Sequence, residues 1–425
     1  MRVNDFLASA KMRNRADTTN RDYAYSIGVW LNFLLALGRN WWEATDEDVE
    51  AFQFWRITDP ANEQAVQESS FARDMAGCKT FYRWIGKRHP VRNPFEDRDP
   101  PRGRKRQDVK WLDPAAVDRW ISVGVRGRGL DGRVDPAWRG RNEQRDTAFV
   151  NGLYGTGLRL SSWSSVVLPE LPVPQRGRGY YRCQLADECA KGRYGYRYWM
   201  PRAALRGVIA YIEGAPAAAV RRAQDAGRYE HARHMRLVTA TTRTTAFFAG
   251  RGERQETDWN NLGPDTRRLL FRRTPQGLEP LALWLNEDGL PRAAHGWHHT
   301  FDTANARIRS LGLDGFTCTP HILRHSLALK WFAVGQLVQA ARLGHLSEDE
   351  VRDFREQFGD VWSLVQTILG HRRVETTREV YLEPFEALQV EVLLAHAEGF
   401  PIARFISDAF AGHPRVRTDP LAVGR

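Results

Sequence analysis

The sequence predicts a mostly helical protein with a small β-sheet, built from an N-terminal helical domain and a larger mixed α/β domain. Three observations predict this class. The chain has 425 residues, more than one hydrophobic core of ordinary size accommodates. Apolar residues recur at helical spacing through the first hundred residues, and two strand-like runs at 180–185 and 193–200 lie among later helical segments. A hydrophobic content of 42% supports a folded chain.

Residues 1–97 are predicted to form the helical domain. Between the start signal Thr18-Thr19 and Gly38, apolar residues follow a helical period, and Thr45 with Asp48 resembles a capping box for a second helix. A third helix is expected from about Ser70. The aromatic stripes of these helices are interpreted as core, in preference to surfaces that stack on bases.

Residues 98–112 are predicted to be an interdomain linker. The stretch RDPPRGRKRQDVK at 98–110 contains paired prolines and six basic residues against two aspartates. A solvated linker and a strap along a phosphate backbone both fit this composition. The DNA contacts expected for the strap come from Arg102, Arg104, Lys105 and Arg106.

The second domain is predicted over residues 113–425. A helix is expected over 143–154, ending in the Gly-Thr-Gly at 155–157, and Arg159 opens the next helix. Lys191-Gly192 lies in the turn between the two strand-like runs. The arginine-rich region of about 214–280 is interpreted as a partly mobile insertion, helices are expected again from about Trp297, and an apolar oligomerisation tail is expected over about 383–425.

Charge and composition narrow the function classes. The formal net charge of +11 predicts an acidic partner, first of all nucleic acid. No apolar run approaches the ~20 residues of a spanning helix, and the N-terminus lacks a signal peptide's apolar stretch, so no membrane association is expected. The four cysteines are too few and too scattered for a disulfide framework or zinc site, which indicates a reducing compartment and no metal.

The stretch TPHILRHS at 319–326 indicates an anion site. Thr319 suits the N-cap and Pro320 the first helical position, which puts His321 in the first turn, where unpaired N–H groups favour an anion. Arg324 follows three residues later on the same face. A capped core helix with two solvated charges is the alternative for this octapeptide alone.

Further along, Leu369-Gly370-His371 ends one helix and a tyrosine follows ten residues after His371. The polar side chains of interest are then Arg159, Lys191, His321, Arg324, His371 and Tyr381.

These residue types suit attack on a phosphodiester by a protein hydroxyl. Arginines can clamp the non-bridging oxygens, on which negative charge grows in the transition state. A tyrosine hydroxyl needs a nearby base, for which His321 is placed, and the leaving 5′-oxygen needs a proton, which Lys191 can give. His371 can donate a hydrogen bond to a phosphate oxygen. A covalent linkage conserves bond energy, so no ATP, metal or cofactor is expected.

The segments GTGLRLSS, AKGRYGYRYWMP, TPHILRHS and LGHRRVETTREVYL, in this order, resemble the tyrosine recombinase and phage-type integrase family. The resemblance implies a core-binding domain, a linker and a catalytic domain in which Tyr381 forms a 3′-phosphotyrosyl link to DNA. It also implies a homotetramer on two double-stranded DNA sites, and a directionality factor stays open as a further partner. The expected role is the integrase of a mobile genetic element, in the cytoplasm at the nucleoid.

The chain departs from the family pattern in places. Ser162 stands three residues after Arg159, where the family usually has a carboxylate, which leaves the orientation of Arg159 in question. A second Leu-Gly-His at 343–345, within an expected insertion at 334–361, has no tyrosine ten residues later and is interpreted as a decoy. Two alternatives therefore remain: a catalytically impaired DNA-binding accessory protein, and a nicking-closing enzyme of the type IB topoisomerase kind.

Overall fold

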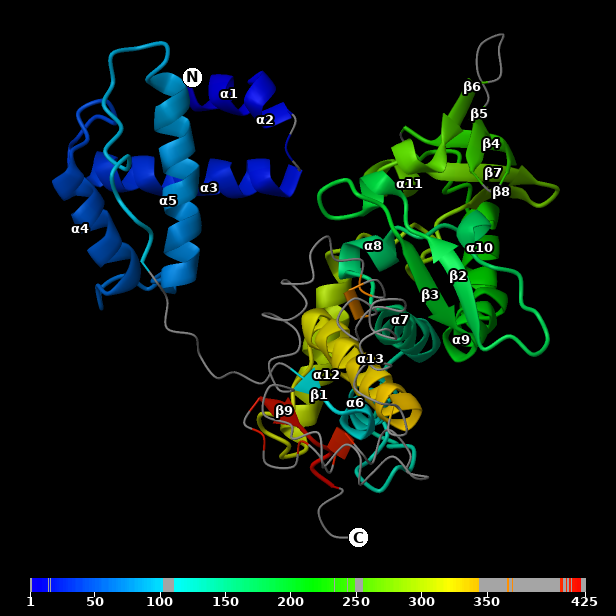
Figure 1. Cartoon of the computed structure of the whole chain (residues 1–425). Helices are drawn as coiled ribbons and strands as arrows, with labels where there is room; N and C mark the ends of the chain where they lie inside the picture. The colour runs from blue at the N-terminus through cyan, green and yellow to red at the C-terminus, as the bar shows by residue number, and fades with distance from the viewer. Residues whose placement is uncertain are drawn as a thin grey trace. The chain divides into compact units, whose positions relative to one another are not determined.

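The computed structural model divides along the chain into two compact units, Met1–Arg106 and Gln107–Arg425. The residues it describes are 2–13, 15, 17–101, 111–232, 234–242, 244–248, 255–343, 365–366, 369, 406–407, 410, 413 and 415–421. The structure is helical with small sheets, as the sequence predicts (Figure 1). The four linker residues predicted to contact DNA, as well as His371 and Tyr381, lie outside the described residues.

The first unit is all helical in its described part. Its helices are α1 (Arg2–Leu7), α2 (Ala10–Arg13), α3 (Asp17–Ala36), α4 (Asp46–Ile57) and α5 (Glu68–Ile85). The predicted capping box is present, since the Thr45 hydroxyl accepts from the Asp48 N–H and the Asp48 carboxylate accepts from the Thr45 N–H. The helix after Thr18 ends before Gly38, whose φ of 69° only glycine adopts without cost.

Most aromatic residues of this unit pack in or against its core, as predicted, whereas Tyr25, Trp42 and Phe54 are exposed. Trp30 is fully buried and lies 5.0 Å, centroid to centroid, from both Phe52 and Phe95. The Trp30 indole also donates to the Tyr82 hydroxyl, which in turn donates to the Trp41 carbonyl. Burial raises the pKa of the Tyr82 hydroxyl well above its ordinary value. These rings hold α3, α4 and α5 together.

The second unit combines helices with three small sheets. Its helical segments are α6 (Pro114–Trp120), the π-helical turn Ile121–Val125, α7 (Glu143–Thr156), α8 (Leu160–Ser164), the 3-10 turns Leu168–Glu170, Asp187–Cys189 and Trp259–Asn261, α9 (Arg202–Glu213), α10 (Ala215–Asp225), α11 (Pro264–Arg267), α12 (Gly296–Ser310) and α13 (Pro320–Leu343). Its strands are β1 (Trp111–Leu112), β2 (Tyr180–Gln184), β3 (Arg197–Pro201), β4 (Arg236–Thr241), β5 (Thr245–Phe248), β6 (Gln255–Asp258), β7 (Leu270–Thr274), β8 (Gly277–Pro280) and β9 (Val416–Arg417).

The predicted hairpin is present: β2 and β3 pair antiparallel, with Tyr181 opposite Met200 and Cys183 opposite Tyr198. These four side chains point to one face and are buried there. The opposite face, with Arg182 and Arg197, is exposed. The connection between the two strands contains Lys191.

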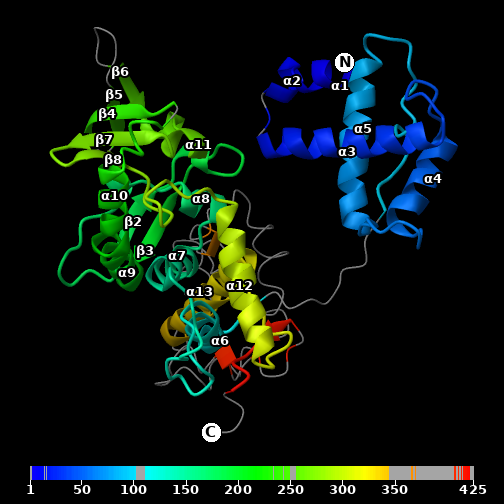
Figure 2. The same ribbon diagram turned by 180° about the vertical axis from the view of Figure 1, so that it is seen from behind.

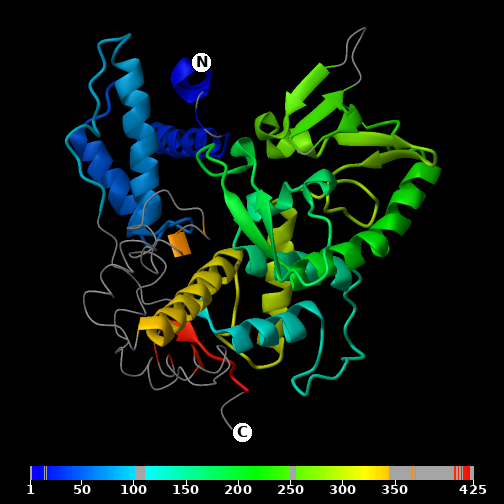
Figure 3. The same cartoon turned by 45° about the vertical axis from the view of Figure 1, so that its right-hand side comes forward.

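The region 214–280, which the sequence predicts to be a partly mobile insertion, has regular secondary structure over most of its described length. It contains α10 and a five-stranded sheet in the order β6-β5-β4-β7-β8, in which β4 and β7 are parallel (Figures 2 and 3). Two sets of buried side chains support this sheet. One set comprises Val167, Val238, Ala246, Phe248, Trp259, Leu262, Leu270 and Leu281; the other comprises Val220, Ala223, Tyr229, Phe271, Leu278, Ala282 and Leu285.

One helical stretch among the described residues, Arg202–Asp225, is long and apolar enough to cross a membrane by length and composition alone. It consists of α9 and α10, with a break at Gly214, where φ is −93° and ψ is −117°. Leu205, Val208 and Tyr211 bury one side of α9 in the core that contains α7. These contacts identify the stretch as a pair of packed core helices.

Described residues near the C-terminus pack on their own chain. Strand β9 pairs in parallel with β1, so Trp111 lies opposite Val416. Ile406 and Phe410 belong to the same buried cluster as Trp111 and Phe332. Asp113, which caps α6, accepts a hydrogen bond of 2.7 Å from the Ser407 hydroxyl. This part of the predicted oligomerisation tail thus completes the core of its own unit.

Candidate active site

The segment that carries Arg159 is held by buried aromatic residues. Helix α7 ends at Gly157, whose φ of 64° is left-handed, and Arg159 is the N-cap residue of α8. Within α8, the Trp163 indole donates to the Phe149 carbonyl over 3.0 Å, and the Trp284 indole donates to the Trp163 carbonyl over 3.1 Å. Arg159 itself is half-buried at the start of this fixed helix.

Lys191 is exposed in a turn with a defined backbone. Gly192 and Arg193 follow it with φ of 78° and 54°, respectively, both left-handed. The Asp187 carboxylate accepts from the Gly195 N–H over 2.7 Å and bridges the base of the turn. Arg193 forms an ion pair of 3.1 Å with Glu188. The turn therefore presents the lysine to solvent on an ordered support.

Helix α13 begins as the sequence predicts. The Thr319 hydroxyl accepts from the Ile322 N–H over 3.2 Å, and Pro320 occupies the first helical position. His321 is exposed, whereas Leu323 is fully buried. His325 is also buried, with its ring edge-on to the rings of His321 and Trp111 at 5.0 and 6.0 Å. His325 is therefore part of the packed interior at the start of α13.

Arg324 is 1% exposed, so it is not one of the solvated charges of the alternative interpretation. Its guanidinium donates to the Gly157 carbonyl at the end of α7 and, over 2.6 Å, to the Leu369 carbonyl. The first of these acceptors lies two residues before Arg159, and the second lies two residues before His371. Arg324 therefore ties together the chain segments of three predicted site residues.

The electrostatics of His321 bring the described site residues together. Desolvation by the surrounding protein lowers the pKa of His321, and the positive charges of Arg324, Arg159 and Lys191 lower it further. The residue keeps an exposed side, so desolvation is partial. A lowered pKa keeps the imidazole neutral near pH 7, the form that accepts a proton. Three cations that lie far apart in the sequence, Arg324, Arg159 and Lys191, thus act on the protonation of one candidate base.

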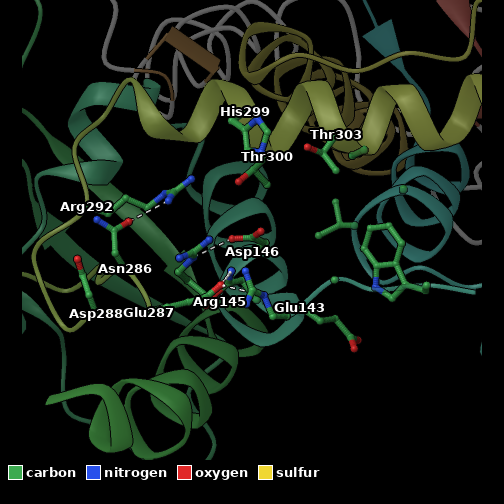
Figure 4. Close-up of a pocket in the computed structure, with 17 residues that line it drawn as sticks. Glu143, Arg145, Asp146, Asn286, Glu287, Asp288, Arg292, His299, Thr300 and Thr303 are labelled. Atoms are coloured by element: carbon green, nitrogen blue, oxygen red, sulfur yellow. Dashed lines mark hydrogen bonds and ion pairs between the residues drawn. The ribbon is translucent and has the colours of Figure 1, made fainter. Parts of the chain in front are cut away.

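Among the described residues, no group of three or more histidine, cysteine, aspartate or glutamate side chains could hold a metal ion. His299 lines a polar cavity of about 560 Å³ (Figure 4). Arg145 and Asp146 of α7 and Arg292 line the same cavity, but none of the four predicted catalytic residues that the structure describes does. All four cysteines are buried free thiols.

Two buried residues, Arg267 and Ser162, make contacts near the candidate site that the sequence does not predict. Arg267, in α11 of the five-stranded sheet region, is 2% exposed and forms an ion pair of 2.6 Å with Glu170. Despite desolvation, Glu170 raises the pKa of Arg267, so the guanidinium stays charged. Ser162 is 1% exposed and donates to the Cys189 carbonyl, two residues before Lys191.

A family model matches the first unit, and several solved structures are similar to most of the chain. Residues 3–89 match the family model of the phage integrase N-terminal SAM-like domain. No curated protein matches the chain by sequence. Among solved structures, the chain is similar to the XerH site-specific recombinase bound to difH substrate in a pre-cleavage complex, with 11% identity, 89% of this chain and 82% of that chain covered, and a TM-score of 0.47.

The chain is also similar to the Tn1549 transposon integrase in complex with circular intermediate DNA. The identity is 13%, the match covers 89% of this chain and 94% of that chain, and the TM-score is 0.47. A third similar structure is the XerA recombinase, with 14% identity, coverage of 89% and 91%, and a TM-score of 0.32. At these scores no residue role is transferred from the solved structures. The match at residues 3–89 shows that most of the N-terminal unit is similar to the phage integrase SAM-like domain, and it confirms the predicted relationship to the phage-type integrases.

Proposed function

We propose that the protein is a tyrosine-type site-specific DNA recombinase that cleaves and rejoins strands through a 3′-phosphotyrosyl intermediate. Two observations carry the proposal: Arg324 donates to the carbonyls of Gly157 and Leu369, and Arg324, Arg159 and Lys191 each lower the pKa of His321. This cluster lies in a chain whose first unit matches an integrase domain. A net charge of +11 supports DNA as the partner. The integrase of a mobile element is the role that fits best.

In the proposed reaction, neutral His321 accepts the proton of the nucleophile, Tyr381, as its oxygen attacks the phosphorus. Arg159, Arg324 and His371 stabilise the charge on the non-bridging oxygens. Lys191 donates a proton to the 5′-oxygen as the bond to phosphorus breaks, and the reverse sequence rejoins the strand. The contact from Arg324 to the Leu369 carbonyl supports including His371, because that residue follows two positions later.

A nicked suicide substrate tests the proposal. Wild-type protein should form an SDS-resistant adduct with DNA in the absence of Mg²⁺ and ATP, and Tyr381→Phe should form none while binding DNA with nearly unchanged affinity. Lys191→Ala should slow cleavage by about 10²–10⁴-fold, the range for a positioned acid. A substrate with a 5′-phosphorothiolate, whose sulfur leaving group needs no proton, should recover most of that loss.

Three outcomes would contradict parts of this assignment. DNA binding without any adduct would favour the accessory protein. An adduct that persists in Tyr381→Phe and maps to another residue would exclude Tyr381 as nucleophile. Relaxation of supercoiled DNA without strand exchange between two sites would favour the topoisomerase-like enzyme.

We also propose that the active assembly is a homotetramer on two DNA sites, at the nucleoid in the cell. Deleting residues 400–425 would be a poor test, because it removes β9 and the buried residues Ile406 and Phe410 from their own unit. Light scattering of the intact chain with DNA that carries one or two sites is the better measurement. A mass that stays at one or two protomers with two-site DNA would exclude the tetramer.

A further inference from the structure

We propose that Ser162 and Arg267 are positioning residues that hold the Lys191 turn against the helix of Arg159. This inference rests on the proposed function, because it assigns the support of two of the residues used there. It gives a role to the serine that stands where the family usually has a carboxylate. It also gives a role to the sheet region at 214–280, which supplies Arg267.

The first contact joins the two catalytic segments directly. The Ser162 hydroxyl in α8 donates to the Cys189 carbonyl over 2.8 Å. Ser162 is three residues after Arg159, and Cys189 is two residues before Lys191. The bond is buried, so water does not replace it readily when the hydroxyl is removed.

Arg267 connects both ends of this bond to the sheet region. Its Nη1 donates over 3.3 Å to the Ser165 carbonyl, and the Ser165 hydroxyl donates over 2.8 Å to the Ser162 carbonyl. Its Nε donates over 2.7 Å to the Leu262 carbonyl, which also accepts from the Cys189 thiol over 3.5 Å. A closed ring of contacts thus runs from α8 through Arg267 to the Lys191 turn and back through Ser162.

The chemistry of this ring explains why a serine suits this position. The Cys189 carbonyl can only accept, so its partner must donate a hydrogen. An ionised carboxylate at 162 only accepts and would face the carbonyl oxygen with a negative charge. Restoring the residue type that is usual in the family is therefore expected to harm this chain. Ser162→Asp should cleave DNA more slowly than wild type.

Ser162→Ala tests the positioning role, with Ser161→Ala as control, since Ser161 is the exposed neighbour in the same helix. Ser162→Ala should slow cleavage of the ordinary suicide substrate by about tenfold, the size expected from removing one neutral hydrogen bond. The 5′-phosphorothiolate substrate should recover most of this loss, because the defect lies in the delivery of a proton. Ser161→Ala should match wild type on both substrates.

A second measurement does not depend on DNA cleavage. Trypsin cuts after lysine and arginine, and both Lys191 and Arg193 are exposed in the turn. Limited proteolysis read by mass spectrometry should show faster cutting after these two residues in Ser162→Ala and in Arg267→Gln than in Ser161→Ala. Thermal melting of each variant shows whether the rest of the unit stays folded, and Ser162→Ala keeps the test valid if Arg267→Gln unfolds.

The outcomes separate this inference from the proposed function. Equal cutting after Lys191 and Arg193 in Ser162→Ala and the control would overturn the positioning role, whatever the protein does to DNA. A cleavage defect in Ser162→Ala that sulfur does not relieve would also overturn it, because the hydroxyl would then act on Arg159 or on the fold. If trypsin cuts Ser162→Ala faster but the wild-type protein forms no adduct with DNA, the proposed recombinase function is rejected. The positioning of the Lys191 turn by Ser162 is then still supported.

Discussion

His321 illustrates at the scale of one residue how the fold changes the protonation of a side chain. Its lowered pKa arises from desolvation and from three cations. Only the neutral ring accepts a proton, so cleavage should decline at acid pH as the pH falls through this lowered pKa. The decline should come at a lower pH than for an ordinary histidine, whose pKa is about 6.5.

Lys191→Gln and Arg159→Gln should each raise the pKa of His321, because each removes a positive charge that disfavours the protonated ring. An NMR titration of the His321 ring, assigned with His321→Gln, measures the shift. Arg182→Gln is the control, since Arg182 is exposed on β2 and is not among the cations that lower this pKa. An equal pKa of His321 in the wild type and all three variants would contradict the effect of Lys191 and Arg159 on His321.

Gly157 is a second residue on which the site depends. Its φ of 64° is left-handed, and a Cβ at this position would come within 2.6 Å of Leu327 Cδ2. Gly157→Ala should therefore destabilise the second unit through backbone strain and a clash, together about 2–4 kcal/mol. It should also disturb the carbonyl that accepts from Arg324.

Gly312→Ala is the matched control for this change. Gly312 follows α12 with a φ of 79°, and nothing lies within 4 Å of the added Cβ, so only the backbone strain of about 1 kcal/mol applies. Urea unfolding of both variants measures the difference. Equal destabilisation would mean that the packing of Leu327 adjusts to the extra methyl group.

At the scale of the elements, a buried ion pair joins three helices of the first unit. Asp74 in α5 accepts over 3.1 Å from Arg56 in α4 and over 2.7 Å from the hydroxyl of Ser26 in α3. Both charged side chains are less than 10% exposed. Asp74→Ala leaves the arginine charge buried and unpaired, which should cost about 3–5 kcal/mol in the free energy of unfolding.

Arg92→Ala is the control for the ion pair, because Arg92 is 72% exposed and pairs with Asp46 at the surface. Its expected cost is below about 1 kcal/mol. Adding Arg56→Met to Asp74→Ala should recover part of the stability, since no charge is then left unpaired. Urea unfolding followed by tryptophan fluorescence checks all three. A small effect of Asp74→Ala would show that water reaches Arg56.

Element boundaries were predictable where the signals that set them are local. The capping box at Thr45, the start at Thr319-Pro320 and the stop at Gly157 each depend on a few neighbouring residues. Helices α1 and α2 were missed, although Phe6 and Met12 are fully buried. Their segments are too short to show a helical period.

The five-stranded sheet was missed for a different reason. Strand β4 pairs with β7, which follows it after two other strands, and Val238 is its only buried residue. A strand rich in threonine and arginine with long-range pairing has little local signal.

The site shows the same contrast. Arg159, Lys191, His321 and Arg324 could be proposed from the sequence because chemistry restricts the residue types that suit the proposed reaction. The role of Arg267 could not be, since nothing in the sequence separates it from its neighbour Arg268, which is partly exposed and pairs with Asp265.

At the scale of the whole molecule, the basic linker is predicted to add affinity for DNA without sequence preference. Replacing Arg102, Arg104, Lys105 and Arg106 with serine should flatten the plot of log K against log salt concentration by up to about 0.9 for each phosphate that is no longer neutralised. A variant with lysine at the three arginine positions keeps the charge and should keep the slope. An unchanged slope in the serine variant would show that the linker only connects the two units and does not contact DNA phosphates.

The pairing of β1 with β9 has a consequence for synthesis of the chain. Trp111 follows the linker, yet its partner strand and its buried neighbours Ile406 and Phe410 are made roughly three hundred residues later. The first unit can fold while the ribosome is still translating the second, because its described contacts are complete by Arg98. The second unit cannot close until Val416 has left the exit tunnel. A nascent chain that has already folded its integrase-type domain therefore still has an incomplete core beside α13, and premature termination before Ile406 would yield a product with an exposed apolar surface that proteases can recognise.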